Sequence, residues 1–443
     1  MNPGPRSESI EADAGAAREP IGVVGVGWVG LVTAACFAER GHQVWAVDID
    51  AEKVAALSAG KLSIYEPGLP ELVAANADRL HFTTAISDVL EHTRLLFCCV
   101  DTPPTYSGDA DLSRVRSVVA ELSGGSEHAL VMKSTVPSGT GESIRRDLPS
   151  LAYVSCPEFL KEGSAVADFL NPDRVVIGAD AGDDWAADAL AEAYRPLGGE
   201  LVRTDVASAE MIKLASNAFL ATKISFINEI ANVCEEVGAD VTEVSRGMGL
   251  DERIGPKFLN AGIGYGGSCF PKDVSALKQL AGNSGYHFQL LNAVIEVNEL
   301  QKRRVLGKLS KRLGSLVGKR IALLGLAFKP HTDDMREASS LVLASRLQGE
   351  GAEVVAYDPV AAEVAAGLLP SIEMAASPEA ALAGADAAVL VTEWPQFAEL
   401  GWSAVASSMA QPILVDGRNF LDPVALTAAG ITYEGIGRGA GRT

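Results

Sequence analysis

The sequence predicts an α/β fold made of two Rossmann-like, doubly wound domains joined by a long central helix. The glycine turn GVGWVG at residues 25–30 follows a short apolar strand and opens a helical pattern. Residues 207–237 contain neither glycine nor proline and repeat apolar residues at helical spacing. A second alternation of strand and helix patterns begins at Arg320. Together these observations favour two sheets covered by helices, on either side of a helical linker.

Length and composition define the expected organisation. A chain of 443 residues with 48% apolar residues can bury several cores. Its patterns divide it into a disordered tail at 1–20, a dinucleotide-binding domain at 21–205, a central helical region at 206–300 and a second Rossmann-like domain at 301–443.

Charge and cysteine usage argue against several classes of function. The chain has 37 basic and 57 acidic residues, and its net charge of −20 disfavours nucleic acid or an anionic membrane as the main partner. No apolar run is long enough to span a bilayer, and residues 1–20 lack the apolar segment of a signal peptide. Six cysteines and six histidines lack the paired spacing of metal ligands. We therefore expect no metal and a reducing, cytoplasmic compartment.

The first domain begins with the pattern of a dinucleotide-binding turn. Its segments follow in the required order: strand Ile21 to Val24, helix pattern Trp28 to Arg40, and strand Gln43 to Val47. Gly25 makes the tight turn, Gly27 admits a pyrophosphate, and Gly30 lets the helix pack closely. Asp48, at the end of the second strand, can accept hydrogen bonds from the adenosine ribose and repels a 2′-phosphate. The preferred cofactor is therefore NAD.

Five further strand patterns alternate with helical ones: His81 to Thr84, Arg94 to Val100, Ala129 to Ser134, Tyr153 to Cys156 and Arg174 to Gly178. This order predicts a parallel, doubly wound sheet. Ligands of such sheets bind beyond the carboxyl ends of the strands. Because Thr102, Thr135 and Glu158 stand just after strands, we expect them at the ligand site.

The stretch at 207–237 predicts one helix of about 45 Å that bridges the two domains, at 1.5 Å per residue. Lys213 and Asn217 lie four residues apart and share one face, where an ammonium and a carboxamide could address one ligand. An exposed lysine beside a polar helix residue is the alternative.

Cys269 stands in the glycine-rich stretch GYGGSCFPKD at residues 264–273 and is the candidate nucleophile. Gly264, Gly266 and Gly267 would let backbone approach a ligand without obstruction by a Cβ atom. A free thiol is mostly protonated at pH 7, so catalysis needs a helix N-terminus or a cation beside it. The alternative is a buried cysteine that only packs next to a turn.

The second domain is predicted by strand patterns at Arg320 to Leu324, Glu353 to Tyr357, Ala387 to Val391 and Ile413 to Val415. The turn after the first of these strands lacks G-x-G-x-x-G, so this domain should hold something other than a second dinucleotide. Lys329, Arg336 and Arg418 could present positive charge to the first domain across a cleft. A solvated charged surface is the alternative.

Six motifs together resemble the nucleotide-sugar 6-dehydrogenases. They are GVGWVG with Asp48, KSTVPSGT at 133–140, PEFLKEGSAVADFLNPDRVVIG at 157–178, Lys213 with Asn217, GYGGSCFPKD at 264–273 and AFKPHTDDMRE at 327–337. The resemblance covers nearly all of Ile21 to Asp422, and the cysteine loop with its Lys-Asp pair is highly specific. It implies that the alcohol at carbon six of a sugar nucleotide is oxidised twice, to a carboxylate, by two NAD molecules. The RIGPKF run at 253–258 favours UDP-glucose as the substrate.

The resemblance also implies roles for individual residues. Cys269 would attack the aldehyde intermediate to give a thiohemiacetal and then a thioester, Asp273 with a water would act as base, and Lys213 would stabilise the oxyanion. The residues that hold substrate and water would be Asn217, Thr135 and Glu158. Besides the turn glycines, NAD contacts would come from Val26, Asp48, Lys53, Thr102, Thr135, Lys272 and Arg336. Substrate contacts would come from Glu158, Phe159, Leu160, Lys161, Glu162, Lys213, Asn217, Phe258, Leu259, Asn260, Ala261, Gly262, Gly266, Lys329 and Arg418.

Two positions bear on assembly and on cofactor affinity. Arg253 resembles an arginine that in some members of the family reaches the sugar in a neighbouring subunit, which implies a homodimer or a higher homo-oligomer. Trp28 stands where the family often has tyrosine, so a larger ring lies beside the pyrophosphate turn.

Rival functions share parts of this pattern. A GDP-mannose or UDP-N-acetylhexosamine 6-dehydrogenase would have the same turn and cysteine, although the N-acetylhexosamine branch commonly has histidine where Ser268 stands. A two-electron hydroxyacid dehydrogenase would need neither a nucleophilic cysteine nor a second nucleotide-binding domain. A noncatalytic NAD-sensing scaffold would have no reason to keep Lys213, Asn217, Cys269 and Asp273 together.

Overall fold

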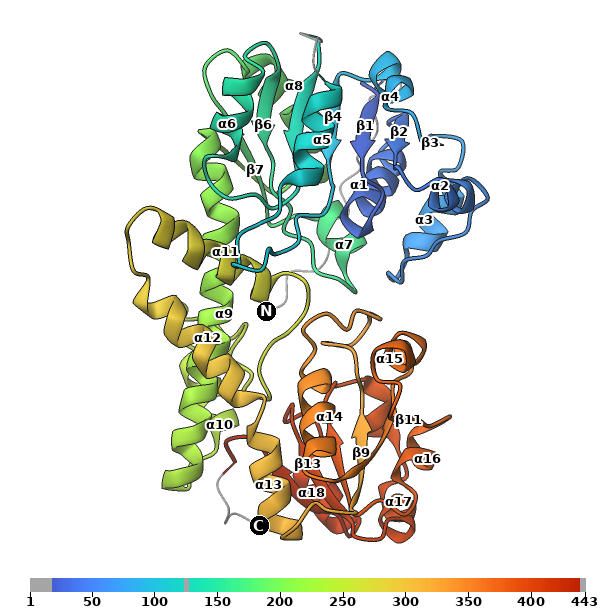
Figure 1. Ribbon diagram of the computed structural model, residues 1–443, viewed down its shortest axis with the longest axis vertical. Coiled ribbons are helices and arrows are strands. Elements are labelled where there is room, and N and C mark those ends of the chain that lie inside the picture. The colour runs from blue at the N-terminus through green and yellow to red at the C-terminus, as the bar shows by residue number, and fades with distance from the viewer. Residues whose placement is uncertain (1–17, 123–126, 439–443) are drawn as a thin grey trace, which may run out of the picture.

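Two sheets lie at opposite ends of the molecule, and the long helix α9 (Val206–Val237) connects them (Figure 1). The computed structural model describes residues 18–122 and 127–438. It confirms the predicted fold class of two Rossmann-like domains joined by a long central helix. Of the tail predicted at 1–20, residues 1–17 lie outside the described residues.

The first sheet has eight strands in the order β3-β2-β1-β4-β5-β6-β7-β8. The strands are β1 Ile21–Val24, β2 Val44–Val47, β3 Leu80–Thr83, β4 Leu95–Cys98, β5 Ala129–Met132, β6 Ala152–Ser155, β7 Arg174–Ala179 and β8 Glu200–Thr204. The central strands β1, β4, β5 and β6 are wholly buried because helices cover both faces of the sheet. The covering and connecting helices are α1 Trp28–Glu39, α2 Ala51–Ser58, α3 Leu69–Ala75, α4 Ile86–His92, α5 Ser113–Glu121, α6 Thr140–Asp147, α7 Ala165–Leu170 and α8 Asp184–Tyr194.

The prediction of a wholly parallel first sheet is wrong at one strand pair. β7 runs antiparallel to β6, with Val154 opposite Ala179, and β8 then pairs in parallel with β7. If β7 ran parallel to β6, the connection would have to cross from the end of the sheet where β6 stops to the end where β6 begins. The connection between these strands contains only the six-residue helix α7, which is about 9 Å long. The chain therefore begins β7 at the same end of the sheet where β6 stops.

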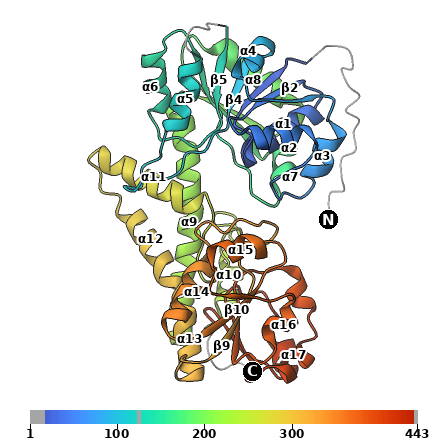
Figure 2. The same cartoon turned by 45° about the vertical axis from the view of Figure 1, so that its right-hand side comes forward.

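The central region consists of helices. α9 begins after Asp205, whose carboxylate accepts a hydrogen bond from the Ser208 N–H, and ends at Gly238, whose φ is 74°. Helices α11 (Phe270–Asn283) and α12 (Gln289–Gln301) both pack against α9 (Figure 2). The remaining helices are α10 Val241–Gly249 and α13 Arg304–Leu313. The predicted bridging helix is thus confirmed.

The second sheet has six parallel strands in the order β11-β10-β9-β12-β13-β14. They are β9 Arg320–Leu324, β10 Glu353–Tyr357, β11 Glu373–Met374, β12 Ala387–Leu390, β13 Ile413–Asp416 and β14 Thr432–Gly435. The helices of this domain are α14 Ser339–Gly349, α15 Ala362–Leu368, α16 Pro378–Leu382, α17 Trp402–Ser408 and α18 Pro423–Ala428.

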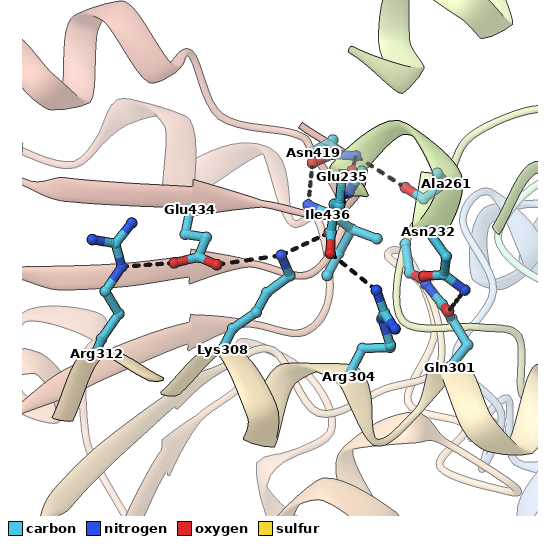
Figure 3. Close-up of polar contacts among 12 residues, drawn as sticks. Asn232, Glu235, Ala261, Gln301, Arg304, Lys308, Arg312, Asn419, Glu434 and Ile436 are labelled. Carbon is cyan, nitrogen blue, oxygen red and sulfur yellow. Dashed lines mark hydrogen bonds and ion pairs between the residues drawn. The ribbon is translucent and has the colours of Figure 1, made fainter. Parts of the chain in front are cut away.

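A row of alternating charges attaches the second domain to the end of α9 (Figure 3). Glu235 of α9 pairs with Arg304 at 3.0 Å and with Lys308 at 2.7 Å, both on α13. Lys308 also pairs with Glu434 of β14 at 3.3 Å, and Arg312 pairs with Glu434 at 2.8 Å. Both glutamates are largely buried, so each charge depends on its neighbours. The network therefore fixes the second sheet against the central helix.

Within the described residues, no helix is both long and apolar enough to cross a membrane.

Candidate active site

A cavity of about 690 Å³ lies where the strand ends of the first sheet meet the cysteine loop and the second domain. The first sheet contributes residues that follow β4, β5 and β6, and the second domain contributes Arg336 and Glu337. The predicted site residues that line this cavity are Thr102, Thr135, Glu158, Glu162, Cys269, Lys272 and Arg336.

The glycine turn has the geometry that a dinucleotide requires. Gly25 has a φ of 88°, and a Cβ on Gly30 would lie 1.8 Å from the Gly25 carbonyl oxygen, so α1 can approach β1 only without that atom. At Gly27 the nearest atom to an added Cβ is an Asp101 oxygen at 4.0 Å. This open space is where a pyrophosphate would approach the N-terminus of α1.

Asp48 lies beside this turn and keeps capacity for a further hydrogen bond. Its carboxylate accepts the Val26 N–H at 2.9 Å, the Asp50 N–H at 3.0 Å and the Lys53 ammonium at 3.0 Å. Burial opposes ionisation, but these hydrogen bonds outweigh it and lower the pKa of Asp48. An ionised acid in this position suits an NAD ribose and disfavours the 2′-phosphate of NADP.

The strand-end residues form one wall of the cavity. The Thr102 hydroxyl donates to the Thr135 carbonyl oxygen at 2.8 Å, and the Ser134 hydroxyl donates to the Val100 carbonyl at 2.6 Å. These bonds tie the loops after β4 and β5 together, as expected at the carboxyl edge of a parallel sheet.

Cys269 lies directly before α11 and lines the cavity. Its Sγ is 3.6 Å from the Ser268 hydroxyl. Burial is the main reason that the pKa of the Cys269 thiol is raised. The charge of Glu158 adds to this effect, and Lys213 only partly offsets it. The expected helix start and cation are both present, but the thiol stays neutral, so its attack requires a base.

Lys213 and Glu158 form a buried ion pair at 2.9 Å. Burial alone would raise the pKa of Glu158, but the charge and hydrogen bond of Lys213, with the Leu160 N–H, outweigh it and lower that pKa. For Lys213, burial is outweighed by Glu158 and then by Cys269 and Asp273, so its pKa is raised. Both groups are therefore ionised. The alternative of an exposed Lys213 is wrong.

Asp273 is fully buried and holds two of the predicted site residues. One carboxylate oxygen accepts from the Asn217 amide at 2.6 Å, and the other accepts from the Lys272 ammonium at 2.6 Å. The Asp273 N–H donates to the Cys269 carbonyl at 2.8 Å, within the first turn of α11. Lys213 and Asn217, on one face of α9, thus both reach the surroundings of Cys269.

The three loop glycines lie where a side chain would collide with the protein. A Cβ on Gly264 would lie 2.7 Å from the Asn298 carboxamide oxygen, and one on Gly266 would lie 2.2 Å from the Glu337 carbonyl oxygen. At Gly267 it would lie 2.7 Å from the Phe328 ring. These glycines therefore allow close contact with the protein itself, and of the three only Gly267 lines the cavity. That they also admit a ligand stays a prediction.

Three predicted cations of the second domain have different surroundings. Arg336 pairs with Asp334 at 2.7 Å and with Glu162 at 3.3 Å. Burial lowers the pKa of Lys329, against the charge of Glu162. Arg418 is largely buried and donates to three backbone carbonyls, those of Val391, Gly264 and Phe328, so it fastens the cysteine loop to the second domain. A solvated surface is the wrong description of Arg418.

Glu162 joins the two domains beside the cavity. It accepts from the Ser268 hydroxyl at 3.3 Å and from the Thr332 hydroxyl at 3.4 Å, in addition to Arg336. Burial, and then the neighbouring carboxylate of Asp334, raises the pKa of Glu162 to about 7. This carboxyl therefore titrates near neutral pH.

The other predicted substrate residues are not among the residues that line this cavity. The central carbon of the Arg174 guanidinium lies 3.8 Å from the centre of the Phe159 ring, and Lys161 pairs with Asp168 at 3.1 Å. The segment Phe258, Leu259, Asn260, Ala261 and Gly262 begins with a left-handed φ of 65° at Phe258 and ends at Gly262, whose N–H donates to the buried Asn228. Arg253 is exposed and pairs with Asp251 of its own loop at 2.6 Å.

Sequence reasoning missed Lys133, a buried lysine that also lines the cavity. Its ammonium donates to the Tyr194 hydroxyl at 3.0 Å and lies 5.7 Å from the centre of the Phe169 ring. A charged residue directly after the apolar stretch Ala129–Met132 was the available signal.

The chain matches three domains of one family along most of its length. The NAD binding domain of the UDP-glucose/GDP-mannose dehydrogenase family matches residues 19–198, its central domain matches 207–300, and its UDP binding domain matches 322–423. UDP-glucose 6-dehydrogenase TuaD of Bacillus subtilis is 45% identical over 437 residues, which cover 95% of this chain and 94% of the relative. UDP-glucose 6-dehydrogenase of Pseudomonas aeruginosa is 46% identical over 442 residues, which cover 94% and 97%.

Solved structures agree with these matches. A UDP-glucose dehydrogenase from the archaeon Pyrobaculum islandicum has a TM-score of 0.89 and 37% identity, covering 96% of this chain and 99% of that one. A UDP-D-ManNAc dehydrogenase from Pyrococcus horikoshii has a TM-score of 0.82 and 29% identity, covering 95% and 99%. The chain therefore belongs to the UDP-glucose/GDP-mannose dehydrogenase family and is an NAD-dependent oxidoreductase.

Proposed function

We propose that this enzyme oxidises UDP-glucose to UDP-glucuronate and reduces two NAD molecules for each sugar. The main supporting observation is the position of Cys269, which lines a cavity shared with the dinucleotide turn and lies within electrostatic reach of the Lys213–Glu158 pair and Asp273. Relatives at 45% and 46% identity bear the name UDP-glucose 6-dehydrogenase.

The proposed chemistry needs both a nucleophile and a source of positive charge. NAD, when bound, would supply the hydride acceptor for each oxidation. In the first oxidation the hydroxyl proton at carbon six leaves through a water, with Asp273 as the base. After the first oxidation, the Cys269 sulfur bonds to the aldehyde carbon while its proton leaves to Asp273 through a water. The second hydride leaves this carbon to give a thioester, and water then releases the carboxylate and the free thiol. The Lys213 ammonium, held by Glu158, stabilises the oxyanion of the intermediates.

The remaining residues bind and orient in this proposal. Asn217 holds the Asp273 carboxylate at 2.6 Å and can turn its carbonyl oxygen or amide toward the sugar. Thr135 and Glu158 hold substrate and water at the strand ends. Asp48 with Lys53 receives the adenosine ribose. Lys272, Arg336 and Thr102 complete the cofactor contacts.

Other functions remain as alternatives with a common test. A GDP-mannose or UDP-N-acetylhexosamine 6-dehydrogenase would use the same cysteine. UDP-glucose is favoured because relatives at 45% and 46% identity over nearly the whole chain bear the name UDP-glucose 6-dehydrogenase. A noncatalytic scaffold would have no use for a buried, ionised Lys213–Glu158 pair beside a thiol.

The proposal includes a homodimer or a higher homo-oligomer in the cytoplasm. Helix α9 exposes several large apolar side chains, namely Phe219, Phe226, Val233 and Val237, which suit an interface with a second copy. Arg253, exposed on its own chain, would then reach the sugar bound to the partner. The six cysteines form no disulfide, which suits a reducing compartment.

The test is a substrate screen with stoichiometry. UDP-glucose, GDP-mannose and UDP-N-acetylhexosamines are each incubated with NAD, and NADH is followed by its absorbance. We expect UDP-glucose to be preferred and to yield about two NADH per sugar, because the thioester route needs two hydride transfers. One NADH with released aldehyde would contradict the mechanism, and a preference for GDP-mannose would contradict the substrate.

A further inference from the structure

Glu66 is a buried carboxylate that none of the roles above uses. It stands in the loop before α3 and is 2% exposed. One oxygen accepts the Trp28 indole N–H at 3.0 Å and the Gly163 N–H at 2.8 Å, and the other accepts the Ala165 N–H at 2.9 Å. Its hydrogen bonds therefore join segments that are 38 to 99 residues away in sequence.

The first of these donors belongs to the cofactor turn. Trp28 directly follows Gly27, the residue with open space for the pyrophosphate, and its ring lines the cavity. A dinucleotide bound at this turn would limit the movement of the Trp28 ring, and the indole N–H fixes the ring relative to Glu66. A cofactor bound at this turn would therefore restrain a side chain that is hydrogen-bonded to Glu66.

The other two donors belong to the loop that carries the proposed substrate residues. Gly163 follows Glu162, and Gly163 with Ala165 lies at the start of α7. Gly163 has a φ of 83°, and a Cβ there would lie 2.9 Å from the His331 carbonyl oxygen of the second domain. Its neighbour Glu162 contacts Ser268, next to Cys269. The turn that Glu66 holds therefore lies against the UDP binding domain, and the residue just before this turn contacts the cysteine loop.

We propose that Glu66 is a positioning residue that couples NAD binding to sugar-nucleotide binding through Trp28 on one side and the 163–165 turn on the other. The coupling works in both directions, since each ligand must raise the affinity for the other by the same factor. The inference rests on the proposed function for the identity of the sugar nucleotide. It goes beyond that function because it predicts how the two sites communicate.

The test measures the coupling itself. Calorimetry gives the Kd of UDP-glucuronate without and with saturating NADH, a pair that does not turn over because thioester hydrolysis is not reversed. For the wild type we expect the two values to differ by a factor in the range of roughly 5 to 150, as is typical of coupled sites. In Glu66→Gln and in Trp28→Phe, which keeps an aromatic ring at this position but removes the N–H donor, the factor should fall to about one.

Controls separate positioning from general stability. Trp185→Phe changes a partly buried tryptophan of the same domain outside the cavity lining and should keep the wild-type factor. The double variant Trp28→Phe/Glu66→Gln should lose no more coupling than either single variant, because both act on one contact. A residue with only a structural role would lower the melting temperature and both affinities together while leaving their ratio unchanged.

A wild-type factor of one, or wild-type factors in both Glu66→Gln and Trp28→Phe, would overturn the inference. If Glu66→Gln fails to fold, Trp28→Phe alone still decides, because the indole is only partly buried. Binding of UDP-glucuronate to the wild type is measured first. If the proposed function is wrong, the wild type does not bind UDP-glucuronate. If only the coupling is wrong, the wild type binds it with the same Kd with and without NADH, or both variants keep the wild-type factor.

Discussion

Asp48 and Asp358 occupy equivalent positions in the two sheets but have different capacities to bind a ligand. Each follows the second strand of its domain, and in both domains the turn glycine donates its N–H to the last residue of that strand at 2.8 Å, Gly25 to Val47 and Gly325 to Tyr357. Asp358 accepts five hydrogen bonds from the protein: from the N–H groups of Leu326, Ala327, Val360 and Ala361 and from the Trp394 indole. Asp48 accepts three. Of these two carboxylates, Asp48 therefore keeps the greater capacity to accept a hydrogen bond from a ribose.

Replacing Asp48 with alanine should narrow the preference for NAD over NADP. The change removes the ribose acceptor and the repulsion of a 2′-phosphate, and it frees the Lys53 ammonium. We expect kcat/KM with NAD to fall by roughly 10- to 100-fold, the value of one or two hydrogen bonds to a charged group. Steady-state kinetics with both cofactors gives the ratio. Asp358→Asn is the matched control, which should lower the melting temperature and keep that ratio, and a wild-type ratio in Asp48→Ala would contradict the assignment.

Replacing Lys213 with methionine should harm both stability and turnover. Glu158 would be left as a buried carboxylate without its cation, which costs about 3–5 kcal/mol. The loss of the oxyanion stabiliser should lower kcat by about 100-fold or more. Thermal melting and kcat are measured together. Glu158→Gln added to Lys213→Met should restore part of the stability and none of the activity, and an unchanged melting temperature in Lys213→Met would show that the pair is not buried in solution.

The fold was predictable where local patterns determine it. The glycine turn and α9 follow from spacing and from the absence of helix breakers. The edge strands β8, β11 and β14 escaped prediction because their residues mix polar and apolar types, and they become strands by pairing with β7, β10 and β13. The antiparallel direction of β7 also escaped prediction, because the sequence does not show how short the helix between β6 and β7 is.

The site was predictable in part. Lys213 and Asn217 follow from helical spacing, and Cys269 and Asp273 from their motif. Glu66 could not be found in this way, because its partners lie far away in sequence and only folding brings them together. The raised pKa of the Cys269 thiol depends on burial and on neighbouring carboxylates, which no motif reports.

Raising the pH through neutrality should weaken the contact between the domains at Glu162. Its pKa rises from 4.5 to about 7 on folding, so the folded chain binds this proton more tightly than the unfolded chain. The stability gained from protonation is fully present below the unfolded pKa and is lost as the pH rises through about 7. The carboxyl faces Asp334, Arg336 and Lys329, and the two cations offset only part of the effect of burial and Asp334.

Glu162→Gln should remove this dependence. Melting temperatures of wild type and variant are compared between about pH 5 and about pH 8, and the wild type should lose stability relative to the variant across this range. Glu296→Gln, at an exposed position on α12, is the matched control and should follow the wild type. A constant difference between wild type and Glu162→Gln at all pH values would contradict the raised pKa.

Replacing Cys269 with alanine should separate binding from turnover. The variant keeps Lys213, Asn217 and the cavity walls, so UDP-glucose should bind with little change, whereas oxidation to the uronate should fall by roughly 1000-fold or more. Calorimetry and NADH absorbance measure the two effects. Ser268→Ala, which removes only the neighbouring hydroxyl at 3.6 Å, is the control and should keep most of the activity.

Replacing Cys269 with serine tests the covalent step. A hydroxyl is a poorer nucleophile than a thiol at neutral pH, and an alkoxide is a worse leaving group than a thiolate, so any ester formed with the enzyme should hydrolyse slowly. Incubation with UDP-glucose and NAD should therefore leave sugar nucleotide attached to the variant, seen as added mass in intact-protein mass spectrometry. The Cys269→Ala protein, treated in the same way, should show no added mass. Near-normal production of the uronate by either variant would exclude Cys269 as the nucleophile, and direct oxidation of the hydrated aldehyde would then become the better mechanism.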